Sequence, residues 1–386
     1  MKRIVVLYGA YDRYNYGDNL MPILLEKYVK KFHTEKLKEI DFVYSSIKAS
    51  DLSNYKCMPT VAMRDLLDIP PGSTVIVVGG EVLGASVGIL YTHVQDSLLV
   101  TKFLRLINRI SPSLLNKFAK SYYDAVWEYP YIPDKRSFKN NVKVIFNTVG
   151  AKPPVSQRNN IKNSDYISVR DDRTFNYVST FCESKLVPDS VLMASGIIDN
   201  SFFDTVVRQE IKDKIRKDYI SIQACPYKVN FTAQELANQL DKTINEHNLD
   251  VILLPIGYAS GHDDIVFLEK VKSLSKRDML ILDDLNVWEI MYIIANSKAF
   301  YGTSLHGVIT AMSFLVPHFS INKKIAKLTS FVKTWSVYPY NTPIEINDIP
   351  NTISKMADYS DVELRIAVEK AQGIIYKSLD EVSNLL

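Results

Sequence analysis

Short, continuous apolar runs recur along the chain and alternate with segments whose apolar positions repeat every three or four residues. Continuous hydrophobicity is typical of strands that are covered on both faces. The predicted strands are 4–7, 74–78, 142–146, 166–169, 220–223, 251–255, 280–282, 299–301 and 318–321. The predicted helices include 20–32, 233–247, 264–274 and 287–295. Strands and helices in alternation predict an α/β fold with parallel sheets of the doubly wound type.

The alternation is interrupted near residues 196–215, where a charged stretch precedes a fresh series of strands and helices. We therefore expect an N-terminal Rossmann-like domain over residues 1–205 and a C-terminal Rossmann-like domain over residues 206–386, facing one another across a cleft. The last helical segment, residues 361–386, is expected to pack back on the first domain.

Charge and composition exclude several classes of protein. The 46 Lys and Arg residues nearly balance the 43 Asp and Glu residues, and a net charge of +3 disfavours a nucleic-acid partner. The three cysteines are odd in number and far apart, which favours a reducing, cytoplasmic compartment. No apolar run approaches the ~18 to 20 residues of a membrane-spanning helix. The first apolar run is too short for a secretory signal and predicts a strand.

Residues 97–123, here named the basic insertion, do not follow the alternation and contain no acidic residue. Cations and apolar side chains are interleaved there in the pattern of a basic amphipathic helix, which is broken at Pro112. Two interpretations stay open. The insertion is either a pair of helices whose cations are simply solvated, or a surface that contacts an anionic membrane or a lipid-linked substrate. The cations are Lys102, Arg105, Arg109, Lys117 and Lys120.

The loops that follow the strands are the first places to search for a site, because ligands of open parallel sheets bind beyond the carboxyl ends of the strands. After the first predicted strand, Asn15, Gly17 and Asp18 precede a helix. Glycine permits a tight turn there, and Asp18 or Asn19 can cap the helix and leave backbone N–H groups free for an anion. A cap alone would also explain these residues.

A glycine pair, Gly79 and Gly80, follows another buried strand and permits close approach of a ligand. Neither this pair nor the earlier loop has the glycine spacing of a dinucleotide fingerprint or of a P-loop. Nicotinamide, flavin and P-loop nucleotide enzymes are therefore disfavoured.

Arg170 and Asp171 follow a third predicted strand. An arginine that points from a strand end into a cleft can donate two parallel hydrogen bonds to a phosphate or a carboxylate. The alternative is a purely structural one, in which Asp171 or Asp172 caps the next helix and forms a salt bridge with Arg170.

The segment 302–307 carries the most informative pattern in the chain. A buried strand runs into Gly302, Thr303 and Ser304 can cap the next helix, and His306 lies in its first turn. The dipole of a helix favours an anion at that end. A histidine beside a bound phosphate ester is suited to general acid or base catalysis, since its ordinary pKa lies near neutrality.

A metal site at His262, Asp263 and Asp264 is disfavoured. Adjacent aspartates point in different directions on most backbones, and neither His247 nor His262 has a partner at ligand spacing. We expect no metal, and we interpret this segment as a polar loop at the mouth of the cleft, with Asp263 capping the helix that begins at Asp264.

In their order and spacing these motifs resemble the polysaccharide pyruvyl transferase family over roughly residues 1–320. Each motif is weak by itself, and their order is specific. The resemblance implies a fold of two Rossmann-like domains of the GT-B type, as in many glycosyltransferases. The matching residues are Asn15, Gly17, Asp18, Gly79, Gly80, Ser168, Arg170, Asp171, Pro188, Asp189, Ser190, Leu254, Pro255, His262, Asp263 and the block from Gly302 to Gly307.

The resemblance also implies a transferase that uses phosphoenolpyruvate to place a pyruvate ketal on a sugar of a surface polysaccharide or of its lipid-linked precursor, with no further cofactor. Phosphoenolpyruvate is a small anion, and it calls for an arginine and helix N-termini rather than a nucleotide pocket. In the implied reaction a general acid protonates the methylene carbon, a sugar hydroxyl attacks the adjacent carbon, and a second hydroxyl closes the ketal as phosphate leaves.

The implied roles fall on residues of the strand-end loops. His306 is expected to act as the acid or to bind phosphate, Arg170 to clamp phosphate or carboxylate, and Asp18 or Asp189 to act as base toward the acceptor. The expected substrate-binding residues are Asn15, Gly17, Gly79, Gly80, Asp189, Gly302, Thr303, Ser304, Leu305 and Gly307.

The chain departs from the family at one position. Some members carry an arginine two residues before the late histidine, where this chain has Ser304. Either another cation such as Arg158, Arg173 or Lys323 reaches the phosphate, or the donor differs. Two further functions stay open: a glycosyltransferase with a nucleotide-sugar donor, in which Glu289 would contact the nucleotide, and a non-catalytic subunit that holds polysaccharide enzymes at a membrane through the basic insertion.

Overall fold

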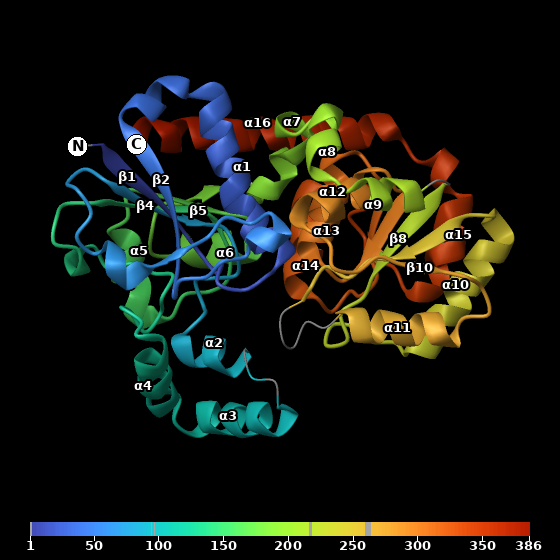
Figure 1. The fold of residues 1–386 in the computed structure, drawn as a ribbon, viewed down its shortest axis with the longest axis horizontal. Coiled ribbons are helices and arrows are strands. Elements are labelled where there is room, and N and C mark those ends of the chain that lie inside the picture. Colours follow the sequence, from blue (N-terminus) through green and yellow to red (C-terminus); the bar gives the residue numbers. More distant parts are fainter. Residues whose placement is uncertain (1, 94, 96, 216–217, 259–263) are drawn as a thin grey trace.

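A computed structural model describes residues 2–93, 95, 97–215, 218–258 and 264–386 and shows two α/β domains side by side (Figure 1). Within these residues the first sheet has seven strands in the order β3-β2-β1-β4-β5-β6-β7, and the second has five in the order β10-β9-β8-β11-β12. The described strand pairs in both sheets are parallel. The predicted fold class, two doubly wound parallel-sheet domains, is confirmed.

Each strand predicted from an apolar run is present within a few residues. The prediction missed β2, β3 and β7; β2 is only partly buried, and β3 and β7 have two residues each. The strands are β1 (Arg3–Tyr8), β2 (Ile40–Ser46), β3 (Val61–Ala62), β4 (Thr74–Val78), β5 (Lys143–Val149), β6 (Tyr166–Val169), β7 (Lys185–Leu186), β8 (Tyr219–Gln223), β9 (Asp250–Leu253), β10 (Leu280–Ile281), β11 (Ala299–Gly302) and β12 (His318–Ser320).

The helices confirm the predicted bounds of α10, α11 and α12, whereas α1 begins at Tyr16 rather than near Leu20. They are α1 (Tyr16–Phe32), α2 (Val87–His93), α3 (Leu98–Ile110), α4 (Pro112–Tyr123), α5 (Arg158–Lys162), α6 (Asp172–Val178), α7 (Ala194–Ile197), α8 (Asn200–Val206), α9 (Gln209–Lys214), α10 (Ala233–His247), α11 (Asp264–Leu274), α12 (Val287–Ala295), α13 (Leu305–Ser313), α14 (Ala326–Trp335), α15 (Ile349–Ser354) and α16 (Asp361–Leu385).

The central strands are buried along most of their length. Residues 5–8 of β1 and 75–78 of β4 are at most 1% exposed, and residues 299–301 of β11 are 0% exposed. Helices cover both faces of such a sheet, and its ligands bind beyond the carboxyl ends of the strands. The site is therefore expected in the loops that follow these strands.

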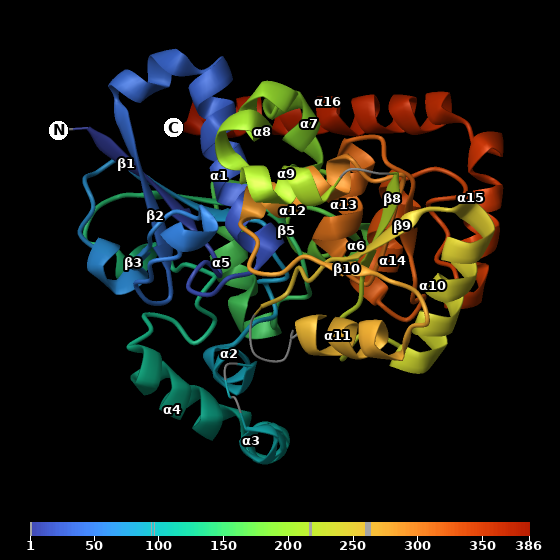
Figure 2. The same ribbon diagram turned by 45° about the vertical axis from the view of Figure 1, so that its right-hand side comes forward.

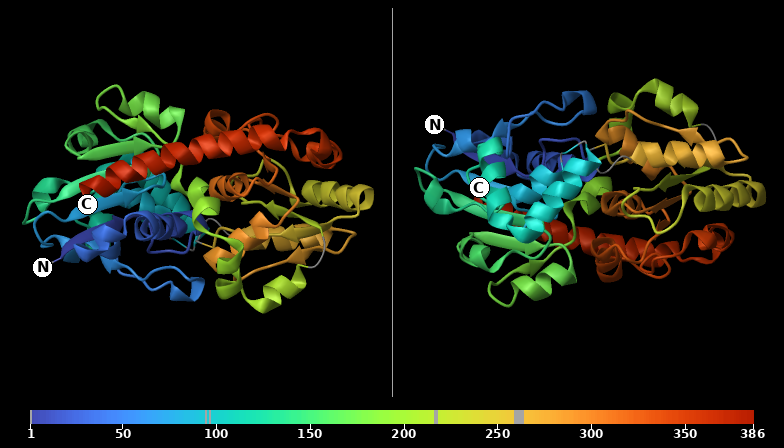
Figure 3. Two further views of the ribbon diagram at one scale, coloured as in Figure 1. Left: turned by 90° about the horizontal axis from the view of Figure 1, so that it is seen from above. Right: turned by 90° about the horizontal axis from the view of Figure 1, so that it is seen from below.

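Helix α16 runs from the second domain across the first (Figures 1 and 3). The Tyr28 hydroxyl donates a hydrogen bond to Asp380 Oδ1 at 2.7 Å, and the Tyr166 and Ser378 hydroxyls lie 2.7 Å apart. Through these bonds the last helix joins the first domain to the second.

Helix α8 spans the boundary expected after residue 205 and packs on the second domain. The Phe203 ring centroid lies 5.5 Å from that of Tyr292 and 6.1 Å from that of Phe314. The chain thus crosses between the domains before α8.

The basic insertion forms α3 and α4, which pack with α2 and project from the first domain (Figure 2). Leu115 and Ala119 of α4 face inward and are at most 3% exposed. None of the described helices combines the length and the apolar composition that crossing a bilayer requires.

Candidate active site

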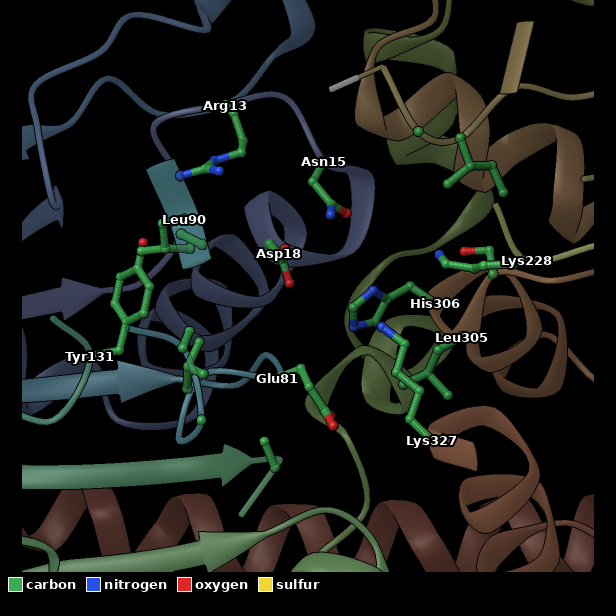
Figure 4. A pocket seen from close by; sticks show the side chains of 18 of the residues that line it. Arg13, Asn15, Asp18, Glu81, Leu90, Tyr131, Lys228, Leu305, His306 and Lys327 are labelled. Atoms are coloured by element: carbon green, nitrogen blue, oxygen red, sulfur yellow. The ribbon is translucent and has the colours of Figure 1, made fainter. Parts of the chain in front are cut away.

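A cavity of about 450 Å³ lies between the two domains, at the carboxyl ends of both sheets (Figure 4). Side chains from the loops after β1, β4 and β6 meet side chains from the loops after β8, β11 and β12. The polar and charged residues that line the cavity are Arg13, Asn15, Asp18, Glu81, Tyr131, Arg170, Gln223, Lys228, Asp264, Ser304, His306 and Lys327. The cavity thus brings together Asn15, Asp18, Arg170, Ser304, Leu305 and His306 of the predicted site.

Helix α1 opens the first-domain side of the cavity. Its N-cap is Asn15, whose side chain makes no capping bond to the described residues of the helix. The prediction that Asp18 or Asn19 caps this helix is wrong, because both lie inside its first turn; the Asn19 amide instead donates to the carbonyl of Arg13 at 2.8 Å. The first N–H groups of α1 therefore face the cavity without a side-chain cap, which favours an anion.

Helix α13 opens the second-domain side. Ser304 is its N-cap, and its hydroxyl accepts a hydrogen bond from the Gly307 N–H at 3.3 Å. Ser304 therefore has the capping role that the sequence predicted. Because α1 and α13 both begin at the cavity, the positive ends of two helix dipoles converge there, one from each domain.

The domains touch directly between Gly17 and His306. A Cβ atom added to Gly17 would overlap the His306 ring. The Tyr16 hydroxyl lies 2.8 Å from the Thr310 hydroxyl, and Asn15 forms an isolated antiparallel bridge with Gly257. Gly17 belongs to the first turn of α1 rather than to a tight turn before it, and the close approach of the other domain explains why the position is glycine.

Arg170, Asp189 and His306 form a buried network. Arg170 is 1% exposed, and its Nη1 donates to Asp189 Oδ2 at 2.7 Å. His306 Nε2 lies 3.5 Å from the same oxygen and makes no hydrogen bond to other described residues. Burial by itself would raise the pKa of Asp189, but His306 and Arg170 hold it well below its usual range. A fully buried carboxylate with a low pKa is suited to orient His306 and does not line the cavity.

Glu81 connects this network to the cavity. Its Oε2 accepts a hydrogen bond from Arg170 Nη2 at 3.1 Å, and its Oε1 accepts one from Arg173. Burial raises the pKa of Glu81, but the charges of Arg170, Lys327 and Arg173 outweigh it and lower the pKa below the ordinary value. Glu81 therefore lines the cavity as a negatively charged carboxylate.

Asp171 caps a helix, as in the structural interpretation of the segment around Arg170. It is the N-cap of α6, where its Oδ1 accepts a hydrogen bond from the Thr174 N–H at 2.9 Å. Its ion-pair partner is Arg173, at 3.5 Å, whereas Arg170 pairs with Asp189 and Glu81.

Lys228 and Lys327 reach the cavity from the second domain, and in Figure 4 both extend toward His306. Neither forms an ion pair with a carboxylate within the part of the chain that the structure describes. Burial lowers the pKa of Lys327 from 10.5 to about 8, helped by the charges of Lys228 and Arg170. These two lysines leave positive charge available to a ligand.

The cations proposed to compensate for Ser304 lie elsewhere. The Arg158 guanidinium stacks on the rings of Tyr177 and Phe181, and Lys323 lies 3.3 Å from Glu345 on the surface. Arg173 pairs with Glu81 behind the cavity wall. The cavity lining does not include any of the three.

Asp264 is a cavity carboxylate that the prediction placed only at a helix start. Its Oδ2 accepts hydrogen bonds from the Gln223 amide at 2.8 Å and from the N–H groups of Ile256 and Gly257 at 3.0 and 2.9 Å. Its Oδ1 is buried and finds no hydrogen-bond partner among the described residues. Burial raises the pKa of Asp264 despite these bonds. His262 and Asp263 lie outside the described residues.

The glycine pair lies outside the cavity lining and affects how α1 packs on β4. Gly79 and Gly80 have φ angles of 66° and 82°, in the left-handed region that favours glycine. A Cβ atom at Gly79 would overlap Met21 of α1, and one at Gly80 would press on Val82 at 2.9 Å and lie in ordinary contact with Asp18 Oδ1 at 3.6 Å. These glycines let α1 approach β4, so they position Asp18 without lining the cavity.

Residues around β11 also act from outside the cavity. The Thr303 N–H donates to Gln223 Oε1 at 2.9 Å, which joins the ends of β8 and β11. A Cβ atom at Gly302 or Gly307 would press on the Phe300 ring. Thr303, Gly302 and Gly307 therefore shape the start of α13.

Glu289 lies away from the cavity. It is 0% exposed, its Oε1 accepts a hydrogen bond from Arg208 Nε at 2.7 Å, and its Oε2 accepts one from the Asn286 N–H at 3.0 Å. These bonds use both oxygens to cap α12 and to hold Arg208.

Within the described residues, no group of His, Cys, Asp and Glu side chains is arranged to hold a metal ion. The prediction left out Arg13, Glu81, Lys228 and Lys327 as site residues. Arg13, Glu81 and Lys228 lie in the loops after β1, β4 and β8, where a search for charged side chains would have found them, whereas Lys327 lies in the first turn of α14.

The chain matches a family model described as polysaccharide pyruvyl transferase over residues 15–323. No curated protein matches the chain. Among solved structures, S. aureus MnaA in a co-structure with UDP is 12% identical, with a TM-score of 0.55 over 100% of this chain and 98% of that chain. The UDP-GlcNAc 2-epimerase from Neisseria meningitidis bound to UDP-GlcNAc is 11% identical, with a TM-score of 0.55 over 99% and 100%. That from Methanocaldococcus jannaschii is 10% identical, with a TM-score of 0.52 over 94% of each chain. At these identities the likeness shows the fold alone, a GT-B-like pair of domains.

Proposed function

The chain belongs to the polysaccharide pyruvyl transferase family, and on that premise we propose that it transfers the enolpyruvate-derived group of phosphoenolpyruvate to a sugar as a ketal. The acceptor is a sugar of a cell-surface polysaccharide or of its lipid-linked precursor. The observation that supports this proposal most is the convergence of two helix N-termini and two lysines on one cavity between the domains, where neither lysine forms an ion pair with a carboxylate of the described residues.

Positive charge from both domains matches the negative charges of the donor in this cavity. Lys228 and Lys327 and the N–H groups at the starts of α1 and α13 bind the phosphate and the carboxylate. Lys327 takes the place of the arginine that some family members carry before the late histidine. Arg170 contributes its charge from behind, since Asp189 and Glu81 already accept its hydrogen bonds.

His306 is the proposed general acid. Asp189, which Arg170 holds by a hydrogen bond, lies 3.5 Å from the His306 ring, and its carboxylate stabilises the imidazolium that donates the proton to the methylene carbon. One sugar hydroxyl adds to the adjacent carbon, phosphate leaves, and a second hydroxyl closes the ketal. Of the two hydroxyl protons, one replaces the proton given to the methyl group and the other leaves with phosphate.

Asp18 is the proposed base toward the acceptor, because its carboxylate lines the cavity from the first turn of α1, opposite His306. Asp264 is a second candidate for the proton donor, because it lines the cavity, burial raises its pKa above the ordinary value, and its Oδ1 finds no hydrogen-bond partner among the described residues.

The test begins with binding. We expect phosphoenolpyruvate to raise the melting temperature, with a stabilisation of about 2.7 kcal/mol at about 100 times Kd, and UDP-sugars and GDP-sugars to leave it unchanged. Stabilisation by the nucleotides alone would assign the cavity to a nucleotide-sugar transferase. Stabilisation by neither would favour a non-catalytic subunit.

Turnover is then followed as phosphate release and as the methyl signal of the ketal in NMR. We expect His306→Asn to lower turnover by a factor of ~10² or more while phosphoenolpyruvate still binds. His247→Asn, on α10 and away from the cavity, is the matched control. Arg170→Ala is a poor test, because it leaves the buried Asp189 without its main partner and so mixes lost catalysis with lost folding. Wild-type turnover in His306→Asn would contradict the role assigned to this residue.

A further inference from the structure

Helix α3 carries an exposed apolar stripe. Leu99, Phe103, Leu106 and Ile110 are 78%, 61%, 52% and 76% exposed. Their spacing of three and four residues places them along one face of the helix. Since Leu104, on another face, is 8% exposed, α3 packs inward through a different set of side chains and leaves this stripe uncovered.

Helix α4 repeats this arrangement. Leu114, Phe118 and Tyr122 follow one another every four residues and are 62%, 55% and 62% exposed. The inward face of the helix holds Leu115 and Ala119, as described above. Contiguous exposed apolar surface of this kind marks an interaction site.

The same hairpin carries positive charge with no acidic residue between positions 97 and 123. All five of its cations are exposed. The first acids that follow it are engaged: Asp124 pairs with Arg64, and Glu128 accepts a hydrogen bond from Asn116 at 2.6 Å. The partner of this surface must therefore offer both an apolar layer and negative charge.

We propose that the α3–α4 hairpin docks on the surface of an anionic lipid bilayer. The apolar stripes enter the boundary between headgroups and acyl chains, and the cations contact the lipid phosphates. A second copy of this chain fits less well, because a symmetric pair joined through the same face would bring like charges together.

Helix α2 links this surface to the cavity. Ile89 and Leu90 line the cavity, and the neighbouring Tyr91 ring lies 5.4 Å from the Phe118 ring and 4.9 Å from the Tyr122 ring, centroid to centroid. Docking through α3 and α4 would thus hold the cavity one helix away from the lipid headgroups (Figures 1 and 2). If the proposed function holds, this arrangement suits an acceptor sugar carried on a lipid.

The test is partition of the whole protein onto vesicles, measured by flotation. We expect binding to phosphatidylcholine vesicles with about 30% phosphatidylglycerol, weaker binding to phosphatidylcholine alone, and weaker binding at about 0.5 M salt. A Phe103→Ser, Leu106→Ser double variant should partition at least roughly tenfold less. The matched control is Val362→Ser with Ile366→Ser on α16, side-chain positions that are 65% and 59% exposed but lie outside the basic insertion.

Circular dichroism should show both double variants folded, because each changes only exposed side chains. Equal partition of the two variants, or no binding of the wild type to anionic vesicles, would overturn the proposal. So would a concentration-dependent dimer that the hairpin variant loses while vesicle binding is absent, since that result assigns the surface to a second copy. Partition needs neither donor nor acceptor, so its outcome is independent of whether pyruvyl transfer is the reaction.

Discussion

The N-termini of the two helices that begin at the cavity, α1 and α13, make different stabilising contacts. The start of α13 is satisfied by its own sequence, since Ser304 caps the Gly307 N–H. The start of α1 lacks a side-chain cap from Asn15 and is completed by the other domain, where His306 packs on Gly17. The anion site on the α1 side therefore depends on how the domains meet, whereas the start of α13 is built locally.

A change at the contact between Gly17 and His306 is expected to affect the site most. In a helix, Gly17→Ala alone would stabilise by about 1 kcal/mol. Here the new Cβ atom overlaps the His306 ring, and overpacking costs about 1–3 kcal/mol. Because the ring must move, we expect turnover to fall by a factor of ~10². Phosphate release and urea unfolding measure the two effects.

Gly373→Ala is the matched control, since Gly373 lies in α16 and a Cβ atom there meets nothing within 4 Å. We expect it to leave turnover unchanged and to raise the free energy of unfolding by up to about 1 kcal/mol. If Gly17→Ala behaves in the same way, the close packing of α1 on His306 is not needed for the site.

We expect Lys327 to make donor binding on the second-domain side of the cavity depend on pH. Its pKa of about 8 means that the folded protein loses this charge between pH 7 and 9.5, whereas an unfolded lysine keeps it to about 10.5. A lowered pKa makes the folded state more stable as pH rises through this window, because the unfolded state then binds more protons. The loss of charge should weaken phosphoenolpyruvate binding roughly tenfold, about 1.4 kcal/mol.

Calorimetric titration at the two pH values measures this effect. Lys327→Met should bind phosphoenolpyruvate roughly tenfold more weakly at pH 7 and show little further loss at pH 9.5. Lys323→Met, a surface lysine of the same segment, is the control and should keep the wild-type pH dependence. An unchanged pH dependence in Lys327→Met would remove this lysine from the donor site.

The smallest expected effect is a difference in unfolding free energy between substitutions of the two N-cap residues, Ser304 and Asn15. Ser304→Ala removes a capping bond and should lower the free energy of unfolding by about 1 kcal/mol. Asn15→Ala removes a side chain that makes no capping bond to the described part of α1, so we expect a change of a few tenths of a kcal/mol at most. Urea unfolding of both variants measures the difference; a larger loss in Asn15→Ala would reverse the comparison.

Much of the fold follows from local patterns. The apolar runs predict the central strands because these are covered on both faces, and α10 and α12 have the predicted bounds because each begins at a capping box, at Thr232 and Asn286. The prediction that the first helix has its cap at Asp18 or Asn19 fails because Asn15 occupies the N-cap without a capping bond, a geometry that composition does not reveal.

The candidate site depends less on local sequence patterns than the fold does. Lys228, Lys327 and Asp264 follow strand ends, but only the packing of the two domains turns them toward the same cavity as Asp18. One of the two interpretations of Arg170 placed its ion-pair partner at Asp171 or Asp172; its partners are instead Asp189 and Glu81, which the sheet brings together from other loops.

The amino-acid sequence alone predicts the parallel-sheet fold, the strand-end loops and the family, because these depend on periodicity and on short motifs. It also determined that residues 97–123 are basic and amphipathic. The outward direction of the apolar stripe of α3 and the packing of His306, from the other domain, on the start of α1 depend on tertiary contacts. An amphipathic pattern indicates which side chains share a face of a helix, whereas contacts between segments distant in the sequence determine whether that face is buried or exposed.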